Sequence, residues 1–253
     1  MSKRREFEAP NMSKKQPIYG FVRATLAALL FKKPKIINLA GKVEENAIVL
    51  ANHSAKSGPP ALDKYYPVKT AKWGAHPMLG TYKDRFNYLR NVLYSKKLGK
   101  KPGFFVTLKS LLMAFFSKWV YKGLRVIPTY TDARFVKTLR YSISVLEQGA
   151  SVMIYPENSN EGYKDILTEF FPGFVMLSEK YYHKHGVSLP VYPVYYSLKK
   201  RIMVIGKPLY VQEFLKEGLN RYEIADRFCK EVNQLYYDYV QDPAEQEVEP
   251  DQN

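Results

Sequence analysis

One histidine in this sequence lies where α/β proteins carry their functional side chains. Asn52-His53 comes directly after the short apolar run AIVLA at residues 47–51, and a polar loop follows. A strand ending there would place the His53 imidazole in the crevice outside the carboxyl edge of a sheet, where ligands bind. A single loop histidine is more often a packing residue than a catalyst, so the prediction of catalysis depends on three further features.

A carboxylate follows a second apolar run in the same way. The run SVMIYP at residues 151–156 is followed directly by Glu157. If the two strands are parallel, Glu157 and His53 lie at the same edge of one sheet. An acid and an imidazole would then share one crevice.

The loop after His53 leads into the start of a helix. Pro59 suits the first helical turn, and Gly58 or Ser57 suits the cap. Backbone amides at such a helix start can hold a phosphate or an oxyanion. The third feature is LPVYPVYYS at residues 189–197, a strand whose prolines flank it and which we expect to line the same pocket.

Strands and helices alternate along the chain, which predicts an α/β fold with a mixed, mostly parallel sheet flanked by helices. The strand candidates are rich in β-branched and aromatic residues and cover 47–51, 124–129, 151–156 and 189–197. Between the second and third, a helix with Asp132 as cap and Gly149 as terminator has an apolar face formed by Phe135, Val136, Leu139, Ile143 and Leu146. This is a βαβ unit.

The last part of the chain predicts two further elements and a tail. Residues 201–211 look like two strands that turn at 206–208, and a capping box of Asn220 and Glu223 opens a terminal amphipathic helix. We expect one folded domain over residues 18–240. A basic N-terminus (1–17) and an acidic tail (241–253) are expected to be disordered.

Charge and cysteine content limit the classes of partner and site. The net charge is +15, and because the last thirteen residues carry five acids and no base, the rest of the chain carries +20. This field favours an anionic membrane surface, a phosphorylated small molecule, an acidic carrier protein or nucleic acid. Nucleic acid is disfavoured, because the aromatic residues lie inside apolar runs instead of along a basic stripe. A single cysteine, Cys229, excludes a disulfide framework and a multi-cysteine metal site.

Two apolar segments are candidates for membrane contact. Residues 18–35 and 104–122 combine large apolar side chains with lysines, and the second adds Trp119 and Tyr121. Each suits either a core helix or a helix lying in a membrane interface. No secretory signal and no run of about twenty apolar residues is evident. We therefore expect a cytoplasmic protein, peripheral at the inner face of a membrane, with an N-terminal helical docking segment.

The ordered stretches resemble the blocks of the glycerolipid acyltransferase superfamily, which includes the 1-acylglycerol-3-phosphate acyltransferases. Asn52-His53 is similar to the start of the His-x4-Asp block, GLRVIPT (123–129) to the second block, and YPENS (155–159) to the Phe-Pro-Glu-Gly-Thr block. LPVYPV (189–194) is similar to the fourth block. The resemblance covers residues 18–240.

The resemblance implies direct transfer of a fatty acyl group from acyl-CoA or acyl carrier protein to a hydroxyl of a lysophospholipid or other glycerolipid. The thioester is a co-substrate, and no other cofactor and no metal is expected. His53 would be the general base, the amides at the helix start would stabilise the oxyanion, and Glu157 would help to place the acceptor. The implied substrate-binding positions are Asn52, Ser54, Ser57, Gly58, Asn158, Ser159 and Asn160.

Departures from the family's blocks affect this chemistry. Gly58 stands where the family has the aspartate that orients the histidine, and Thr129 and Asn160 stand where it has arginines that grip the acceptor phosphate. The acids that could replace the aspartate are Asp63, Asp132 and Glu157, of which we favour Glu157. A backbone carbonyl or Ser57 could orient the imidazole instead. The alternative function is a catalytically inactive, lipid-binding member of the same fold.

The remaining cations and histidines carry weaker predictions. Cations near the motif strands are more often solvated surface charges than phosphate ligands, although they stay candidates for the acceptor phosphate: Lys164, Lys199, Lys200 and Arg201. His183 and His185 are two residues apart and do not share a helical face, which disfavours a metal site. His76 is expected to be structural.

Overall fold

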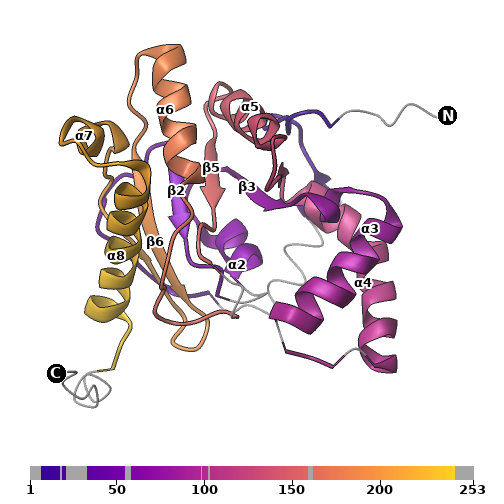
Figure 1. The fold of residues 1–253 in the computed structure, drawn as a ribbon. Coiled ribbons are helices and arrows are strands. Elements are labelled where there is room, and N and C mark those ends of the chain that lie inside the picture. The colour runs from indigo at the N-terminus through magenta and orange to yellow at the C-terminus, as the bar shows by residue number, and fades with distance from the viewer. Residues whose placement is uncertain are drawn as a thin grey trace.

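The computed structural model describes residues 7–17, 19–20, 33–54, 58–97, 99–101, 103–158 and 162–242. In this part of the chain, the centre is a seven-stranded sheet in the order β1-β7-β6-β2-β5-β3-β4 (Figure 1). The strands are β1 (Lys35–Asn38), β2 (Ile48–Ala51), β3 (Thr70–Ala75), β4 (Val126–Thr129), β5 (Ser151–Ile154), β6 (Val191–Ser197) and β7 (Ile202–Ile205).

The sheet is mixed and mostly parallel, which confirms the predicted fold class. Strands β6, β2, β5, β3 and β4 run in one direction, so their carboxyl ends meet at one edge. Strand β7 is antiparallel to β6, and β1 runs parallel to β7. The central strands β2 and β5 are buried along their whole length, as expected for parallel strands that are covered on both faces.

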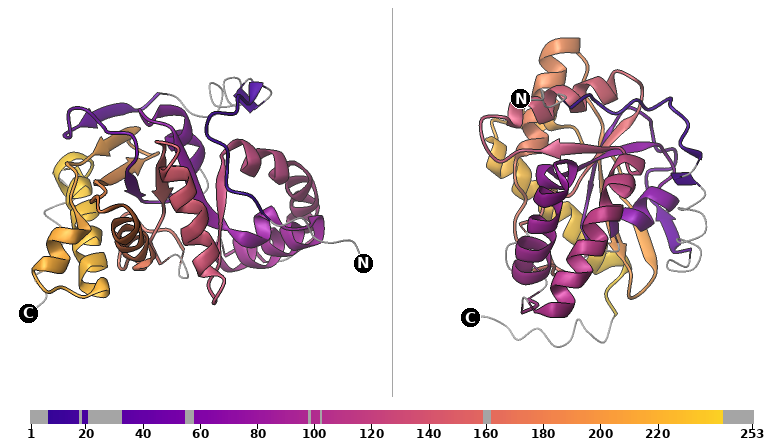
Figure 2. Two further views of the ribbon diagram at one scale, coloured as in Figure 1. Left: turned by 90° about the horizontal axis from the view of Figure 1, so that it is seen from above. Right: turned by 90° about the vertical axis from the view of Figure 1, so that its right-hand side faces the viewer.

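Helices cover the sheet unequally. They are α2 (Gly58–Tyr65), the 3₁₀ turn η1 (His76–Leu79), α3 (Tyr82–Asn87), the π-helical η2 (Tyr88–Lys97), α4 (Phe104–Gly123), α5 (Phe135–Leu146), α6 (Gly173–His185), α7 (Val211–Lys216) and α8 (Arg221–Tyr239). Figures 1 and 2 show α5, α6 and α8 on one face and α2 on the other.

Alternate residues of β2 pack into two hydrophobic cores, one on each face of the sheet. Ile48 and Leu50 pack in the large core with residues of α5, α6 and α8, and Val49 packs with Leu62 of α2 on the other face. This is the two-residue period of a strand, and it buries both faces of β2. The loop that follows β2 therefore starts from a fixed position at the sheet edge.

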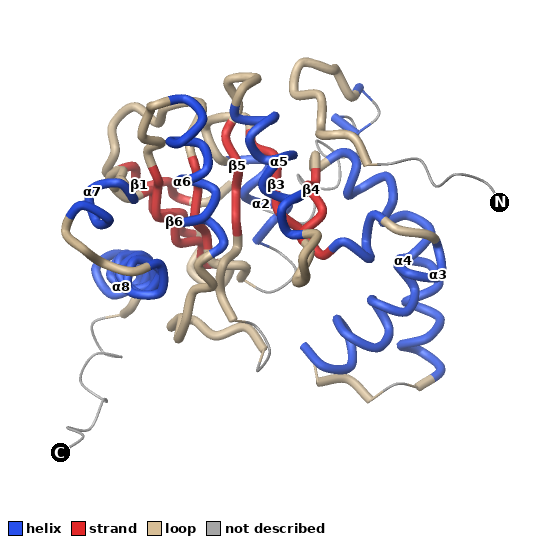
Figure 3. The backbone as a smooth tube through the Cα atoms, turned by 45° about the horizontal axis from the view of Figure 1, so that its top comes forward, coloured by secondary structure: helices blue, strands red, loops and turns tan. Residues whose placement is uncertain are grey.

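A helical hairpin, formed by α3, η2 and α4, is inserted between β3 and β4 and projects from one end of the sheet (Figure 3). The buried Arg85 guanidinium of α3 joins the two arms, because its Nε donates to the Ala114 carbonyl of α4 at 2.9 Å. Its Nη1 donates to the Gly80 carbonyl, just before α3, at 2.6 Å. A small apolar cluster that includes Met78 and Leu89 packs inside it.

Most predicted elements are present, with corrections. The strands expected at 47–51, 124–129, 151–156 and 189–197 are β2, β4, β5 and β6. The Asn220 and Glu223 capping box is confirmed at the start of α8. Val136 was wrongly placed on the buried face of α5, since its side chain is 59% exposed. Residues 201–211 form one strand, β7, followed by an isolated bridge from Leu209 to Val191, instead of two strands.

Part of the expected N-terminal tail packs on the domain. The Met12 side chain is buried, and its backbone amide donates to the Gln148 side chain at 2.8 Å. The Phe7 ring meets the Tyr141 ring edge-on, with 4.9 Å between centroids. Most of the apolar segment predicted at 18–35, namely 18 and 21–32, lies outside the described residues, as do residues 243–253 of the acidic tail.

Candidate active site

Strand register brings His53 and Glu157 to the same height at the carboxyl edge. Leu50 of β2 pairs with Ile154 of β5 in a parallel ladder, and His53 and Glu157 each lie three residues further on. The Glu157 Oε1 atom accepts a hydrogen bond of 2.8 Å from the backbone N–H of His53. The carboxylate therefore fixes the backbone of the histidine loop across the two strands.

Asn52 braces the same loop from the other side. Its Nδ2 donates to the Tyr196 carbonyl at 3.0 Å, and its Oδ1 accepts from the Tyr196 amide at 2.7 Å, so its side chain extends the pairing of β2 with β6. Asn52 is only 3% exposed, which gives it little surface to offer a substrate. Ser54 has φ +43°, a left-handed conformation that bends the chain sharply after His53.

Two tyrosine rings hold the His53 imidazole. The Tyr163 ring stacks on it, with 4.7 Å between centroids and 20° between planes, and the Tyr155 ring meets it edge-on at 5.1 Å. Burial raises the pKa of Tyr155, and the Asp63 and Glu157 carboxylates raise it further. The Tyr155 phenol is therefore neutral at physiological pH.

Helix α2 begins directly against the histidine loop. A Cβ atom on Gly58 would lie 2.1 Å from the His53 carbonyl oxygen, which is an overlap. An aspartate at this position, as in the family's block, would not fit with this backbone. The residues after it are Pro59 and Pro60, which have no N–H. The amide donors expected at this helix start are therefore fewer than predicted, because the first turn has only the Gly58 and Ala61 N–H groups.

The acids considered as replacements for the aspartate have different surroundings. Asp63 on α2 accepts from Lys72 Nζ at 2.5 Å and from the Tyr19 hydroxyl at 3.1 Å, and the Lys72 side chain is 2% exposed. Asp132 forms an exposed ion pair with Arg134 at 2.6 Å. Glu157 accepts the hydrogen bond from the His53 backbone amide, as described above.

Of the other predicted residues, Asn158 binds Glu169 and three lie outside the described part of the chain. The Asn158 amide and side chain both bind Glu169, at 3.1 and 3.0 Å, beside the bridge that joins Glu157 to Phe170. Ser57, Ser159 and Asn160 lie outside the described residues. His185 pairs with Glu147, and the described part of the chain contains no cluster of His, Cys, Asp or Glu suited to a metal.

Comparison with solved structures finds a similar fold. No protein-family model matches the chain, and no curated protein matches it. Among solved structures, it is similar to the crystal structure of the 1-acyl-sn-glycerophosphate acyltransferase PlsC from Thermotoga maritima, with 16% identity and a TM-score of 0.50 over 91% of this chain and 86% of that one. The two chains share a fold. At this identity, the likeness supports the architecture that the sequence blocks predict.

Sequence reasoning missed the two rings and the buried ion pair. Tyr155 and Tyr163 were visible as the first and last residues of YPENSNEGY, but nothing in the sequence indicates that both turn toward His53. Lys72 reads as a surface lysine in the sequence. Its burial depends on Asp63, which reaches it from a different element.

Proposed function

We propose that this protein transfers a fatty acyl group from acyl-CoA or acyl carrier protein to a hydroxyl of a lysophospholipid or other glycerolipid. The observation that carries the proposal is the position of His53. It follows the central strand of a sheet with the fold of an acyltransferase, and its loop is fixed by Glu157 at 2.8 Å. The ordered sequence blocks support the same assignment.

In this mechanism His53 is a general base. The imidazole takes the proton of the acceptor hydroxyl while the hydroxyl oxygen attacks the thioester carbonyl carbon. The tetrahedral intermediate then expels the thiolate as the C–S bond breaks, and the thiolate takes the proton from the imidazolium. The products are the acylated lipid and a free thiol, with no acyl group on the enzyme. The Gly58 N–H is our candidate for an oxyanion donor.

We assign Glu157 to positioning the loop. A side chain that holds the His53 amide limits movement of the imidazole relative to the acceptor, and such restraint contributes strongly to rate. The stacked Tyr163 ring also limits rotation of the imidazole plane. This arrangement substitutes packing and a backbone hydrogen bond for the aspartate that Gly58 excludes.

A mass-spectrometric transfer assay tests the proposal. Purified wild type, His53→Ala and the control His183→Ala are offered a mixture of lysophospholipids with acyl-CoA and acyl carrier protein donors. We expect a diacyl product from wild type and from the control, whose histidine is exposed on α6, and none from His53→Ala. Full turnover by His53→Ala would refute the mechanism. Folded wild type that binds vesicles but makes no product would favour the inactive, lipid-binding alternative.

Helix α4 supports a proposal about where the protein works. Its buried side is a stripe of small residues, Ser110, Ala114, Ser117 and Gly123. The rest of its surface carries ten exposed large apolar side chains: Phe104, Phe105, Leu108, Leu111, Leu112, Met113, Phe115, Phe116, Trp119 and Val120. A large exposed apolar patch of this kind marks a site of contact with a membrane or another protein.

We infer that α4 rests in the interface of an anionic membrane on its cytoplasmic side. By length and composition, α4 could cross a bilayer, which corrects the expectation that no segment is long enough. Its buried side faces the other arm of the hairpin, where Ala114 packs with Leu89 and Tyr94. Exposed lysines at 109, 118 and 122 suit a helix that lies along the surface. The net charge of the chain, +15, favours anionic lipid.

Vesicle sedimentation tests this placement. Leu112→Glu/Phe116→Glu places two charges on the α4 surface, and Val136→Glu/Val187→Glu places the same charges on exposed valines elsewhere. We expect wild type and the control pair to bind vesicles that contain phosphatidylglycerol, and the α4 pair to bind at least tenfold more weakly. Equal binding by both pairs would refute docking through α4.

A further inference from the structure

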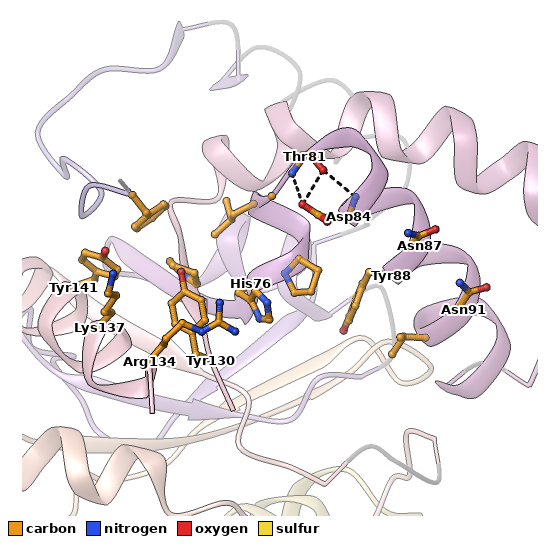
Figure 4. Close-up of a pocket in the computed structure, with 16 residues that line it drawn as sticks. His76, Thr81, Asp84, Asn87, Tyr88, Asn91, Tyr130, Arg134, Lys137 and Tyr141 are labelled. Atoms are coloured by element: carbon orange, nitrogen blue, oxygen red, sulfur yellow. Dashed lines mark hydrogen bonds between the residues drawn. The ribbon is translucent and has the colours of Figure 1, made fainter. Parts of the chain in front are cut away.

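A cavity lies along the same sheet edge as His53. It has a volume of about 1050 Å³ and lies between the hairpin and the junction of β4 with α5 (Figure 4). Tyr130, Arg134 and Lys137 form one wall together with His76, and Asn87 is on the opposite side. The volume is that of a small-molecule site.

The cavity and the histidine loop belong to one edge. His76 follows the last residue of β3, and Tyr130 follows the last residue of β4. Because β2, β5, β3 and β4 are parallel neighbours in that order, three strand spacings separate β2 from β4, or about 14 Å. A ligand of ordinary cofactor or lipid length can therefore occupy the cavity and still reach His53.

Each of the two places has a tyrosine beside it. Tyr163 stacks on His53, and Tyr88 lines the cavity. Burial raises the pKa of the Tyr121 phenol, and the phenols of Tyr88 and Tyr163 raise it further.

The wall of the cavity at β4 is a stack that ends in a cation. The Tyr130 ring stacks on the His76 ring, with 4.9 Å between centroids. The Arg134 guanidinium lies over the Tyr130 ring, 4.6 Å from its centroid. Arg134 uses Nε and Nη2 to bind Asp132. Its Nη1 has no hydrogen-bond partner within the described ranges, so the fork keeps donors for a ligand. Lys137 is three residues further along α5.

Two cations, Arg134 and Lys137, and one carboxylate, Asp84, line the cavity, and the Asp132 carboxylate is paired with Arg134. Asp84 caps the start of its own helix, where its Oδ2 accepts from the Thr81 amide at 2.8 Å and from the Thr81 hydroxyl at 2.7 Å. Burial and the Arg134 charge lower the pKa of His76, against smaller opposing effects of Asp132, Asp84 and the Thr129 backbone. His76 is therefore a neutral hydrogen-bonding group beside two permanent cations.

We propose that this cavity binds an organic phosphate, with Arg134 and Lys137 as its ligands. Arginine binds phosphate oxygens through a planar fork and lysine as a point charge, and Asn87 and Asn91 offer carboxamides on the facing wall. The identity of the molecule that carries this phosphate rests on the proposed function. The phosphate belongs to one of the two substrates, either the head group of the acceptor lipid or the coenzyme A part of the donor.

Calorimetric titration of the full chain tests binding apart from catalysis. Glycerol 3-phosphate and coenzyme A are titrated into wild type, into Arg134→Gln/Lys137→Gln, and into the control Lys180→Gln/Lys216→Gln, whose lysines are exposed on α6 and α7. We expect wild type and the control to bind at least one of the two, and the cavity variant to bind it at least tenfold more weakly. Loss of the same size in both variants, or no binding by folded wild type, would overturn the proposal.

A second measurement locates the bound phosphate and identifies its source. The NMR signal of the His76 ring should shift when the ligand binds wild type, and an unmoved signal at saturation would place the ligand elsewhere and overturn the assignment. In the transfer assay, the cavity variant should raise KM at least tenfold for one substrate, with kcat little changed. A raised KM for the lipid identifies the head group, and a raised KM for the thioester identifies coenzyme A. If wild type transfers no acyl group, the proposed function fails while the titration still decides the cavity.

Discussion

The buried ion pair of Lys72 and Asp63 offers the sharpest prediction about stability. Lys72 Nζ lies 2.5 Å from Asp63 Oδ1, and the two side chains are 2% and 9% exposed. Lys72 also donates to the Thr70 hydroxyl at 2.9 Å, so its charge is well satisfied. Replacing Lys72 with methionine keeps most of the side-chain volume and removes the charge. Asp63 then stays buried next to an apolar group.

The burial of the pair sets the expected size of the effect. Breaking a buried pair by removing one partner costs about 3–5 kcal/mol of unfolding free energy, because the remaining charge is uncompensated. For a chain of this length, this corresponds to a fall in Tm on the order of 10 °C. Replacing both partners, as in Lys72→Met/Asp63→Leu, removes the stranded charge as well. We expect the double variant to recover most of the loss.

Urea denaturation with linear extrapolation measures these differences. Arg221→Met is the control, because Arg221 binds Glu179 at 2.7 Å while its own side chain is 50% exposed. An exposed pair contributes about 0–1 kcal/mol. If Lys72→Met costs no more than the control, or if the double variant is as unstable as the single one, the argument from buried charge is wrong.

Three further predictions follow from single contacts. Glu157→Gln keeps an oxygen acceptor for the His53 amide and should leave stability nearly unchanged, whereas Glu157→Leu should cost about 1–3 kcal/mol in urea denaturation; equal losses would argue against the bracing role. Burial raises the pKa of the Cys229 thiol to about 12, so the folded chain keeps a proton that the unfolded chain releases near pH 8.5. The contribution of Cys229 to stability should therefore fall as pH rises from about 8.5 to 12, and Cys229→Ala should remove that part of the slope in denaturation curves. Asn220→Ala removes the cap of α8 and should cost about 1 kcal/mol by thermal unfolding, while Asn220→Asp, which keeps the acceptor, should cost less.

The central strands and the shared edge were predictable because their signals are local. A short apolar run bounded by turn residues reports burial on both faces, and β2 and β5 are such runs. Once both are parallel, equal spacing past the last apolar residue places His53 and Glu157 together. The capping box of α8 is also local, since its two residues are three apart.

The features that were missed depend on contacts between distant segments. Strand β3 reads TAKWGA, and its lysine argues against a buried strand until Asp63 on α2 is known to neutralise it. Edge strand β1 reads KIIN and is largely exposed, and its two isoleucines are too short an apolar run to predict a strand. The cavity is formed by His76 and Tyr130, which lie more than fifty residues apart in the sequence. Local periodicity does not report such pairings.

The hairpin between β3 and β4 links the proposed membrane-binding surface of α4 to the wall of the cavity. Its arms are joined by the buried Arg85 of α3, which donates to the Ala114 carbonyl of α4. One arm, α4, carries the apolar surface, and the other, α3 with η2, lines the cavity through Asn87 and Asn91. A membrane bound through α4 is therefore held next to the wall of the cavity. If the cavity binds the head group of an acceptor lipid, that lipid needs to move only along the hairpin to present its hydroxyl to His53, and charges placed on α4 should raise KM for vesicle-bound lipid more than KM for the thioester.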